Sequence, residues 1–376
     1  MAHASALERF HQVVVGRHDY AREWKARTGG KAMGYLCTYV PEELAYAAGV
    51  LPVRIMGSHQ PQSVTEGYIF SMWCPYCRDC LAQGLLGRYD YLEGLAFAQT
   101  CQHIRQTFDS WRDHIPLEFS HDIYMPSSLH VPLARECLAG ELRLFQQALE
   151  VWVGHPIATA EVARAVDIYN TNRRLMTQVY ELRQAPHPPI TGVEAMEMVL
   201  ASMFMDKREH NELLRQALSE LGGKVGQNSG MRLMLLGSEN DDTDLVAFVE
   251  SLGGQIVVDD HCTGTRYFWG EVPPGGDLLT AIAQRYVDRP PCPLKDLTER
   301  RRLKHILSLA RDYRVQGAIF VLEKFCDPHE FDLPPIQAAM READIPVLLL
   351  EVDATIPVGQ FRTRIEAFLE MLERGG

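Results

Sequence analysis

The sequence has no stretch of about 18 uncharged apolar residues, the length that a membrane-spanning helix needs. Its start, MAHASALERFHQVVVGRHDYAREWK, carries acids and bases throughout and does not read as a secretory signal. The chain also lacks the G-x-x-x-x-G-K-S/T phosphate loop and the G-x-G-x-x-G, G-x-S-x-G and H-E-x-x-H motifs. We therefore expect a cytoplasmic protein without membrane contact that does not itself hydrolyse nucleotides.

The chain has fewer basic than acidic side chains: 37 Lys and Arg and 49 Asp and Glu, which give a net charge of −12. A nucleic-acid partner needs a basic surface, so nucleic acid is not expected. A small anionic ligand is not excluded, since it needs only a local positive pocket. Hydrophobic residues make up 46% of the 376, which allows sizeable cores in two or three domains of about 150 residues.

Strand-like and helix-like segments alternate in both halves of the chain, which predicts an α/β protein with parallel sheets. We expect two Rossmann- or flavodoxin-like domains joined by a helical region, with limits at 1–135, 136–226 and 227–376. The linker before the last domain is GGKVGQNSG. Expected helices cover 4–28, 78–86 and 192–221, and expected strands cover 33–39, 51–56 and 91–97. Residues 136–183 are expected to be mostly helical. Further on, GAIFVLEKFCDPHEFD reads as strand then loop, and PPIQAAMREADI as helix.

Nine cysteines need an explanation other than disulfides, which are rare in a reducing compartment and need an even count to close. Cys74, Cys77 and Cys80 form C-x2-C-x2-C, a spacing that is typical of metal ligands. The fourth cysteine of a ferredoxin-like motif is absent, so a local cluster motif is incomplete. The alternative for Cys77 and Cys80 is that they are small residues on a helix face.

Cys101 follows the strand GLAFAQT and Cys326 follows AIFVLEK, so each lies at the carboxyl end of a strand, where parallel sheets build their sites. Cysteines placed alike in two domains can face each other across a cleft. With one thiolate from the Cys74 loop, they would form a three-cysteine [4Fe-4S] site whose fourth iron is open to substrate or water. The alternative is buried, unreactive cysteine, the commonest fate of this residue.

Other residues are weaker candidates. Cys37 precedes a helix start, where the helix dipole would lower its pKa, and it is a reserve ligand. Cys137 lies within a predicted amphipathic helix and is expected to be buried in the core. Cys262 could bind a metal together with His261, but a role as an ordinary loop residue is favoured. Cys292, in Pro-Pro-Cys-Pro, is a loop residue that could line a pocket. His329 in CDPHEFD is expected near the cluster, where it would support a ligand or relay a proton, unless it makes only a loop hydrogen bond.

Several motifs, in order along nearly the whole chain, resemble one known family. They are YVPEELAYAAGVLPVRIMG, CPYCR followed by YDYLEGLAFAQTCQHIR, IYNTNRRLMTQVYELR, RYVDRPPCP and FCDPHEFDLPPIQAAMREADIPVLLLEVD. The family contains the D-component of 2-hydroxyacyl-CoA dehydratases and the substrate-binding subunits of ATP-dependent benzoyl-CoA reductase. The length and the YNTNRRLMTQVYELR helix look most like the smaller, C- or gamma-type subunit of that reductase.

The resemblance implies one [4Fe-4S] cluster with three cysteine ligands. By motif, these ligands are Cys74, Cys101 and Cys326. Cys37 matches a position that is cysteine in many members and stays in reserve. Cys77 and Cys80 are extra relative to the usual pattern and leave open a larger cluster, such as the double-cubane form of a related branch. The family often has an acid after the second ligand, whereas this sequence has Gln102.

The resemblance also implies single-electron chemistry at very low potential on an acyl-CoA thioester. An ATP-hydrolysing iron–sulfur activator, fed by reduced ferredoxin, would pass the electron to this chain. A homologous second substrate-binding subunit would complete a heterodimer. In the reductase, the aromatic ring takes up two electrons and two protons and becomes a cyclic diene. The phosphates of CoA would need a local basic pocket, which the sequence does not locate.

Three other functions stay open. A 2-hydroxyacyl-CoA dehydratase subunit is a lyase on the same scaffold that recycles its electron. A double-cubane electron carrier without CoA binding is slightly favoured by Cys77 and Cys80, and a cluster-free structural subunit is the last alternative. Iron and sulfide counts separate a single cluster, with about four of each, from a double cubane, with about eight.

Overall fold

The computed structural model describes residues 4–60, 63–226, 229–355 and 358–375. Within these ranges the strands form two four-stranded sheets, in the orders β2-β1-β3-β4 and β6-β5-β7-β8. All pairings in both sheets are parallel, which confirms the predicted fold class. The first sheet contains β1 (Ala32–Tyr35), β2 (Leu51–Arg54), β3 (Gly94–Ala98) and β4 (Phe119–Ile123). The second contains β5 (Met231–Gly237), β6 (Gly254–Asp260), β7 (Gly317–Glu323) and β8 (Val347–Val352).

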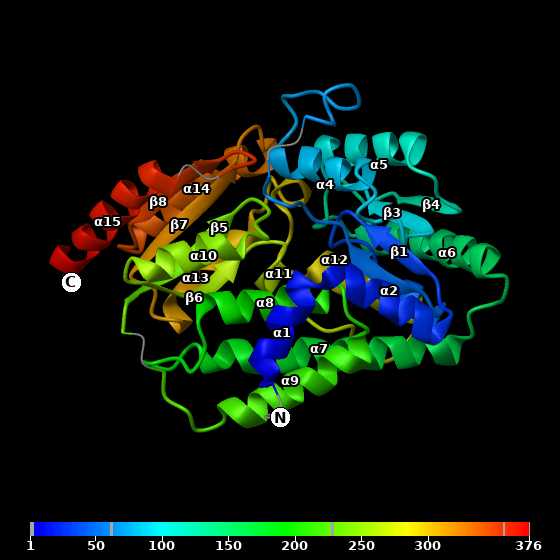
Figure 1. Cartoon of the computed structure of the whole chain (residues 1–376), viewed down its shortest axis with the longest axis horizontal. Coiled ribbons are helices and arrows are strands. Elements are labelled where there is room, and N and C mark those ends of the chain that lie inside the picture. The colour runs from blue at the N-terminus through cyan, green and yellow to red at the C-terminus, as the bar shows by residue number, and fades with distance from the viewer. Residues whose placement is uncertain (1–3, 61–62, 227–228, 356–357, 376) are drawn as a thin grey trace.

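Helices connect the strands and cover the sheets (Figure 1). The first half contains α1 (Ala6–Val15), α2 (Arg17–Thr28), α3 (Glu42–Ala47), α4 (Pro75–Leu85), α5 (Gln102–His114) and α6 (Ala134–Val153). The central helices are α7 (Thr159–Leu182), α8 (Gly192–Ser202) and α9 (Lys207–Leu221). The second half contains α10 (Thr243–Ser251), α11 (Thr265–Phe268), α12 (Leu278–Asp288), the 3-10 helix η1 (Pro293–Lys295), α13 (Arg301–Asp312), α14 (Asp327–Glu342) and α15 (Val358–Gly375). In Figure 1, α7 and α9 run beneath the two sheets.

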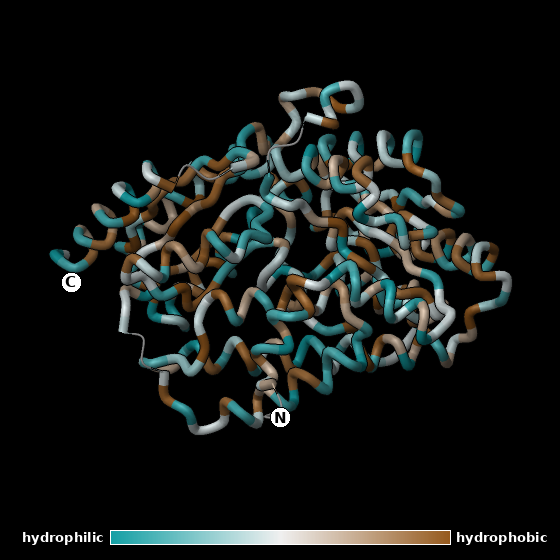
Figure 2. Tube along the Cα trace, in the orientation of Figure 1, coloured by the Kyte–Doolittle hydropathy of each residue, from teal (hydrophilic) through white to brown (hydrophobic). Residues whose placement is uncertain are grey.

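The inner strands are near-continuous runs of apolar residues, as expected for parallel sheets that are covered on both faces. β7 reads GAIFVLE and is buried up to its last residue. β6 is buried throughout although it ends in Asp259 and Asp260, and Arg302 compensates the second of these by donating to it at 2.6 Å. Figure 2 shows the hydrophobic segments gathered in the interior and the hydrophilic ones on the outer helices.

The second half of the chain also supplies part of the cover of the first sheet. α12 follows β6 in the sequence but packs against α6. Its Ile282 and Tyr286 join one core with Met33 of β1 and Leu142 of α6. The packing therefore ties the two sheets together through segments that are far apart in the sequence.

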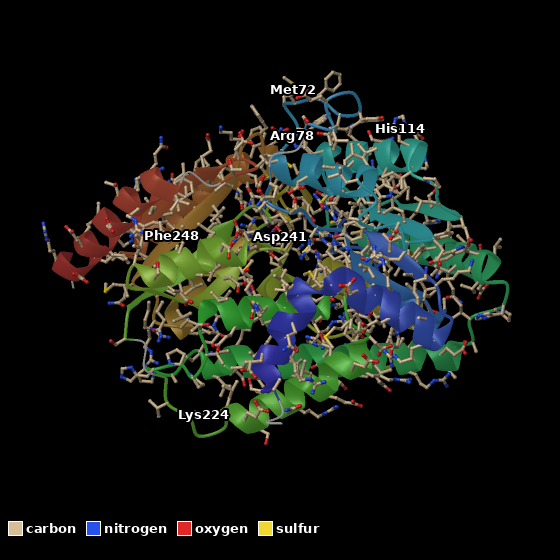
Figure 3. All side chains as sticks on the ribbon, in the orientation of Figure 1. Met72, Arg78, His114, Lys224, Asp241 and Phe248 are labelled. Carbon is tan, nitrogen blue, oxygen red and sulfur yellow. The ribbon has the colours of Figure 1, made fainter. Side chains whose placement is uncertain are left out.

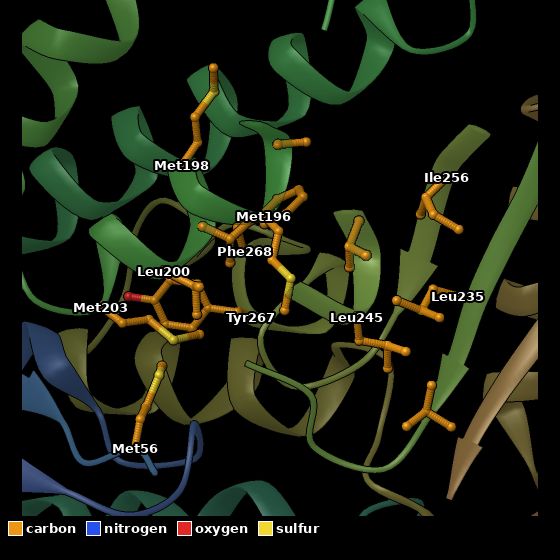
Figure 4. Packing of buried hydrophobic residues seen from close by; sticks show 14 of the residues in the cluster. Met56, Met196, Met198, Leu200, Met203, Leu235, Leu245, Ile256, Tyr267 and Phe268 are labelled. Atoms are coloured by element: carbon orange, nitrogen blue, oxygen red, sulfur yellow. The ribbon is translucent and has the colours of Figure 1, made fainter. Parts of the chain in front are cut away.

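A methionine-rich core joins α8 to the second sheet (Figure 4). Met196 and Met203 lie in or beside α8, Met56 comes from the segment after β2, and Leu235 and Ile256 come from the strands. Unbranched methionine side chains fill irregular gaps well. Within this core, Met56 from the segment after β2 lies beside Met203, the residue that follows α8.

Two predicted helices are each divided in two. Gly16 interrupts the helix expected over 4–28, with φ −94° and ψ 24°, because glycine is a weak helix former. The helix expected over 192–221 is broken at 203–206, where the side chain of Asp206 caps α9 by accepting from the N–H of Arg208 at 2.9 Å. The prediction of single helices was wrong at both places.

Other local expectations also differ from the structure. Cys137 is exposed, because α6 buries Leu138 and Leu142 instead, so the prediction that it lies in the core was wrong. α14 begins at Asp327, directly after Cys326, where a loop was expected. Sequence reasoning also missed α5 and β4. None of the helices in the described ranges is long and apolar enough to cross a membrane.

Candidate functional site

The carboxyl ends of both sheets border one cavity of about 80 Å³. Its lining comes from the ends of, or the segments directly after, β1, β2 and β3 in the first sheet and β5, β6 and β7 in the second, together with the start of α4 and the segment after α12. Parallel sheets place ligand sites at this edge. The lining residues are Leu36, Cys37, Thr38, Tyr39, Arg54, Cys74, Tyr76, Cys77, Thr100, Cys101, Ile104, Glu239, Cys262, Arg266, Arg289, Pro290, Cys292, Glu323, Cys326, Pro328 and His329.

The three cysteines predicted as cluster ligands all line this cavity, and each is the N-cap residue of a helix. Cys74 precedes α4, Cys101 precedes α5 and Cys326 precedes α14. The N–H of Ile104 donates to Sγ of Cys101 at 3.5 Å. Helix N-termini carry partial positive charge, so this placement favours the thiolate form of the three cysteines.

The three thiols differ in acidity. Hydrogen bonding to Cys77, helped by the nearby His103, lowers the pKa of Cys74 to about 5. Burial and the charge of Cys74 raise the pKa values of Cys101 and Cys326 well above the ordinary thiol range. The protein alone therefore favours one thiolate, whereas the positive charge of a metal cluster would stabilise three.

Four further cysteines line the same cavity: Cys37, Cys77, Cys262 and Cys292. Cys80 does not, and its Sγ lies instead 3.6 Å from the carbonyl oxygen of Ile55. Of the reserve ligands, the structure thus brings Cys37 and Cys77 to the cavity and leaves Cys80 outside it.

Three buried arginines line the cavity, together with Glu239 and Glu323. Arg54, Arg266 and Arg289 line it, and each is at least 96% buried, with 2%, 2% and 4% of its surface exposed. Nε of Arg266 lies 3.4 Å from Asp260, and Nη2 of Arg54 donates to Glu239 at 3.3 Å. Three guanidinium groups at one cavity suit an anionic ligand, which includes a cluster held by thiolates.

His329 is buried at the cavity wall, as its sequence position predicted. Burial, and then the charges of Arg302 and Arg266, hold its pKa well below the usual histidine range. Its Nδ1 has no hydrogen-bond partner among the residues that the structure describes. The ring is therefore neutral at physiological pH, and its role in proton relay stays a prediction.

Hydrogen bonds and ion pairs join the two halves around the cysteines. The N–H of Tyr76 donates to Glu323 at 3.1 Å. Close by, Arg78 donates to Asp353 at 3.1 Å, and Figure 3 shows Arg78 at the top of the molecule, where the two halves meet. These contacts hold the start of α4 against the ends of β7 and β8.

Thiolates of the kind that line the cavity are the usual ligands of iron–sulfur clusters. In the described part of the chain, no three His, Cys, Asp or Glu side chains are arranged to hold one metal ion. A [4Fe-4S] cluster needs its cysteines further apart, because each sulfur binds a different iron. Cysteines on three helix N-termini around a cavity lined by three arginines are compatible with that chemistry. The assignment of Cys74, Cys101 and Cys326 as ligands stays a prediction.

A larger cavity of about 630 Å³ lies beside α1 and α10. Asp241 and Phe248, both labelled in Figure 3, belong to its wall. Nε2 of His59 lies 2.9 Å from Oδ1 of Asp241, and Arg17 donates to the carbonyl of Gly57 at 3.1 Å. These contacts tie the segment after β2 to the segment after β5.

Sequence reasoning missed the cavity arginines and the position of Cys262. Arg54 is the last residue of β2, so the strand-end rule could have found it. Arg266 and Arg289 belong to segments after β6 and α12, and no local pattern marks them. Cys292 does line the pocket, as its rigid Pro-Pro-Cys-Pro loop indicated.

Comparisons with known proteins agree on one family. A family model described as 2-hydroxyglutaryl-CoA dehydratase, D-component, matches residues 37–372. The chain is 29% identical to the (R)-phenyllactyl-CoA dehydratase beta subunit of Clostridium sporogenes, over 96% of this chain and 97% of that one. It is 28% identical to the beta subunit of (R)-2-hydroxyglutaryl-CoA dehydratase from Acidaminococcus fermentans, over 99% and 100%. It is 26% identical to a subunit of benzoyl-CoA reductase from Thauera aromatica, over 87% of each chain.

Proposed function

This chain belongs to the family of the 2-hydroxyglutaryl-CoA dehydratase D-component, and from that premise we propose that it is an iron–sulfur subunit of an enzyme acting on acyl-CoA thioesters. The observation that carries the proposal is the convergence of Cys74, Cys101 and Cys326, each a helix N-cap, on one cavity. Relatives named as subunits of such enzymes match the chain over nearly its whole length.

The chain's own residues would perform three tasks around the cluster. Three cysteine thiolates would hold it, and the helix N-termini behind them would offset their charge. Arg266, fixed by Asp260, would keep a positive charge beside it. Leu36, Ile104 and Pro328 give the cavity apolar walls that limit the access of water. The cluster itself would supply single-electron transfer at low potential.

The first candidate reaction is the reduction of an aromatic acyl-CoA to a cyclic diene, with two electrons and two protons added to the ring. The resemblance of the sequence motifs and a relative named as part of benzoyl-CoA reductase support it. The sequence contains no nucleotide-binding loop, so ATP hydrolysis would belong to a separate iron–sulfur activator fed by reduced ferredoxin. A homologous second subunit would complete the complex.

The second candidate reaction is the dehydration of a 2-hydroxyacyl-CoA, in which water leaves and the electron is recovered after each turnover. Relatives named as dehydratase subunits favour it, with 29% and 28% identity over nearly the full chain. A third candidate is a double-cubane electron-transfer protein. The four further cysteines at the cavity favour that function.

Metal analysis and electron counting test these candidates in order. We expect about four irons and four sulfides per anaerobically purified chain. About eight of each would indicate a double cubane in place of the single cluster. A colourless protein that takes up neither iron nor sulfide would overturn the proposal. With the partner subunit and activator present, net use of two electrons per product supports the reductase. Product formation without net use of reductant supports the dehydratase.

A further inference from the structure

The thiols of two cavity cysteines are in direct contact. Cys74 is the N-cap residue of α4, and Cys77 lies three residues further on, in the first turn of the helix. Both line the cavity, with 6% and 1% of their surfaces exposed. The Cys77 thiol hydrogen-bonds to the Cys74 sulfur. The proposed three-ligand set uses Cys74 alone, so it leaves Cys77 without a task.

This pair has the arrangement that thiol–disulfide enzymes use, a C-x-x-C segment that begins a helix. The segment reads Cys74-Pro75-Tyr76-Cys77, and Pro75 takes the first helical position, where its missing N–H costs nothing. The backbone of Cys74 lies outside the helical region, with φ −57° and ψ 147°. A residue in this conformation can turn its side chain toward the third residue of the helix.

The neighbouring cysteines are engaged differently. Sγ of Cys101 caps α5 by accepting from a main-chain N–H at 3.5 Å, whereas among the residues that the structure describes the Cys74 side chain makes no capping bond to α4. Cys80, the third cysteine of the motif, lies outside the cavity, with its Sγ 3.6 Å from the carbonyl oxygen of Ile55. Cys77 is therefore the partner that the geometry gives to Cys74.

Contacts with α5 order the main chain of the pair. The N–H of Cys74 donates to Nδ1 of His103 at 3.2 Å. The hydroxyl of Thr107 donates to the carbonyl oxygen of Cys77 at 3.3 Å. A backbone that is already ordered has little entropy left to lose when the two sulfurs join.

We propose that Cys74 and Cys77 are a peroxide-sensitive dithiol that closes into a reversible disulfide when the cavity holds no cluster. Hydrogen peroxide is the oxidant, and a cavity of about 80 Å³ has room for it, because a water molecule occupies about 30 Å³ of the liquid. The O–O bond breaks as one oxygen adds to the Cys74 sulfur and gives a sulfenic acid, and the other oxygen leaves as water. The Cys77 sulfur then bonds to the Cys74 sulfur, and the sulfenic oxygen leaves as a second water. Together the two thiols give up two electrons, which the peroxide takes.

The disulfide would keep a proposed cluster ligand recoverable. A sulfenic acid without a partner thiol is oxidised further to an irreversible sulfinic acid, whereas a dithiol reopens a disulfide. Cys77 would thus preserve Cys74 for cluster assembly, a consequence that rests on the proposed function, although the disulfide itself does not. Disulfides in reducing compartments are usually transient and redox-sensing, as this one would be.

Peptide mapping of the full-length, cluster-free chain tests the proposal. Trypsin cleaves after Arg54 and Arg78 and releases one peptide that contains Cys74 and Cys77, while Cys80 falls in the next peptide. After treatment with a small excess of hydrogen peroxide and alkylation of the remaining thiols, we expect the first peptide to be unalkylated and two hydrogens lighter. Treatment with dithiothreitol before alkylation should restore both thiols.

Two variants form a matched pair, because each replaces a buried cysteine of α4. Cys80→Ala should still form the disulfide. Cys77→Ala should instead leave Cys74 as a sulfenic acid that dimedone traps, and then as a sulfinic acid that dithiothreitol does not restore. Free thiols at both positions of the unaltered chain after peroxide, or a bond from Cys74 to Cys101 or Cys326, would overturn the proposal.

Iron uptake separates this proposal from the proposed function. The donor is a scaffold protein that carries a preformed [4Fe-4S] cluster, without added thiol. We expect the oxidised chain to take up iron only after it has been reduced with dithiothreitol and the reagent removed. Equal uptake before and after reduction would overturn the link between the disulfide and cluster assembly. A chain that forms the disulfide but never takes up iron would refute the proposed function and leave the redox pair intact.

Discussion

The main-chain N–H of Tyr76 donates a hydrogen bond of 3.1 Å to Oε2 of Glu323. Tyr76 lies just after Cys74 and Glu323 just before Cys326, so this bond joins two proposed ligand segments from opposite sheets. Burial, and then the Cys74 thiol, raise the pKa of Glu323 well above the usual carboxyl range. A neutral carboxyl at this position keeps a carbonyl-type acceptor facing Tyr76.

Variants of Glu323 should show that the acceptor matters and the charge does not. Glu323→Gln keeps an oxygen acceptor and should unfold at nearly the same urea concentration as the unaltered protein. Glu323→Ala leaves the Tyr76 N–H without its partner and should lower the free energy of unfolding by about 1–3 kcal/mol. Equal losses in the two variants would show that the bond does not join the segments as described.

Cysteine variants should divide into two groups by iron content. Cys74→Ala, Cys101→Ala and Cys326→Ala should each remove the cluster and its visible absorbance. The proposed cluster is held by three cysteines, and each variant removes one of them. Cys137→Ala, at an exposed position on α6, should keep both and is the matched control. Full iron in any of the first three variants would remove that cysteine from the ligand set.

Sequence reasoning located the proposed ligands because their positions follow from sheet topology. Cys101 and Cys326 come directly after buried strands, and parallel strands bring such positions to one edge. Cys37, Cys77 and Cys262 reach the same cavity from loops and helix starts whose paths no local pattern specifies, whereas the Pro-Pro-Cys-Pro loop did indicate that Cys292 could line a pocket.

The missed elements have physical reasons. β4 reads FSHDI and is exposed at two of its central residues, so the apolar run that reveals an inner strand is absent. Arg266 and Arg289 look like ordinary surface charges in the sequence, and only the folded chain buries them beside the cysteines. Cys137 shows the opposite error, because it was predicted to be buried and is exposed. A helical pattern identifies a helix more reliably than it shows which face of the helix a weakly apolar residue occupies.

Gly237 should be the least replaceable glycine at the edge of the second sheet. Its φ is +119°, and an added Cβ would lie 2.0 Å from the carbonyl oxygen of Val321 in the neighbouring strand. We expect Gly237→Ala to cost at least about 1–3 kcal/mol in the free energy of unfolding, from backbone strain and the clash together. Gly140→Ala is the control, because Gly140 lies within α6 with nothing near the new Cβ and should gain about 0.5–1 kcal/mol. A small loss at Gly237 would mean that β5 and β7 separate more easily than their packing indicates.

His59 should make the protein less stable as the pH rises into the alkaline range. Burial lowers the pKa of His59, but the adjacent Asp241 outweighs it and raises the pKa from 6.5 to about 10. The folded state therefore binds this proton more tightly than the unfolded state, so the stabilisation is complete below pH 6.5 and disappears as the pH rises through about 10. His59→Asn removes the titration and suits the backbone, whose φ of 58° asparagine tolerates well. We expect the melting temperature of the variant to lie below that of the unaltered protein at pH 6 and to approach it near pH 10.

The control for this pH profile is His155→Asn, which removes an exposed histidine that lies away from both cavities. Its melting temperature should follow that of the unaltered protein at every pH. A deficit in His59→Asn that is the same from pH 6 to pH 10 would show that His59 acts through packing and not through its charge. A deficit that shrinks with rising pH would establish that the ion pair with Asp241 holds the segment after β2 to the segment after β5.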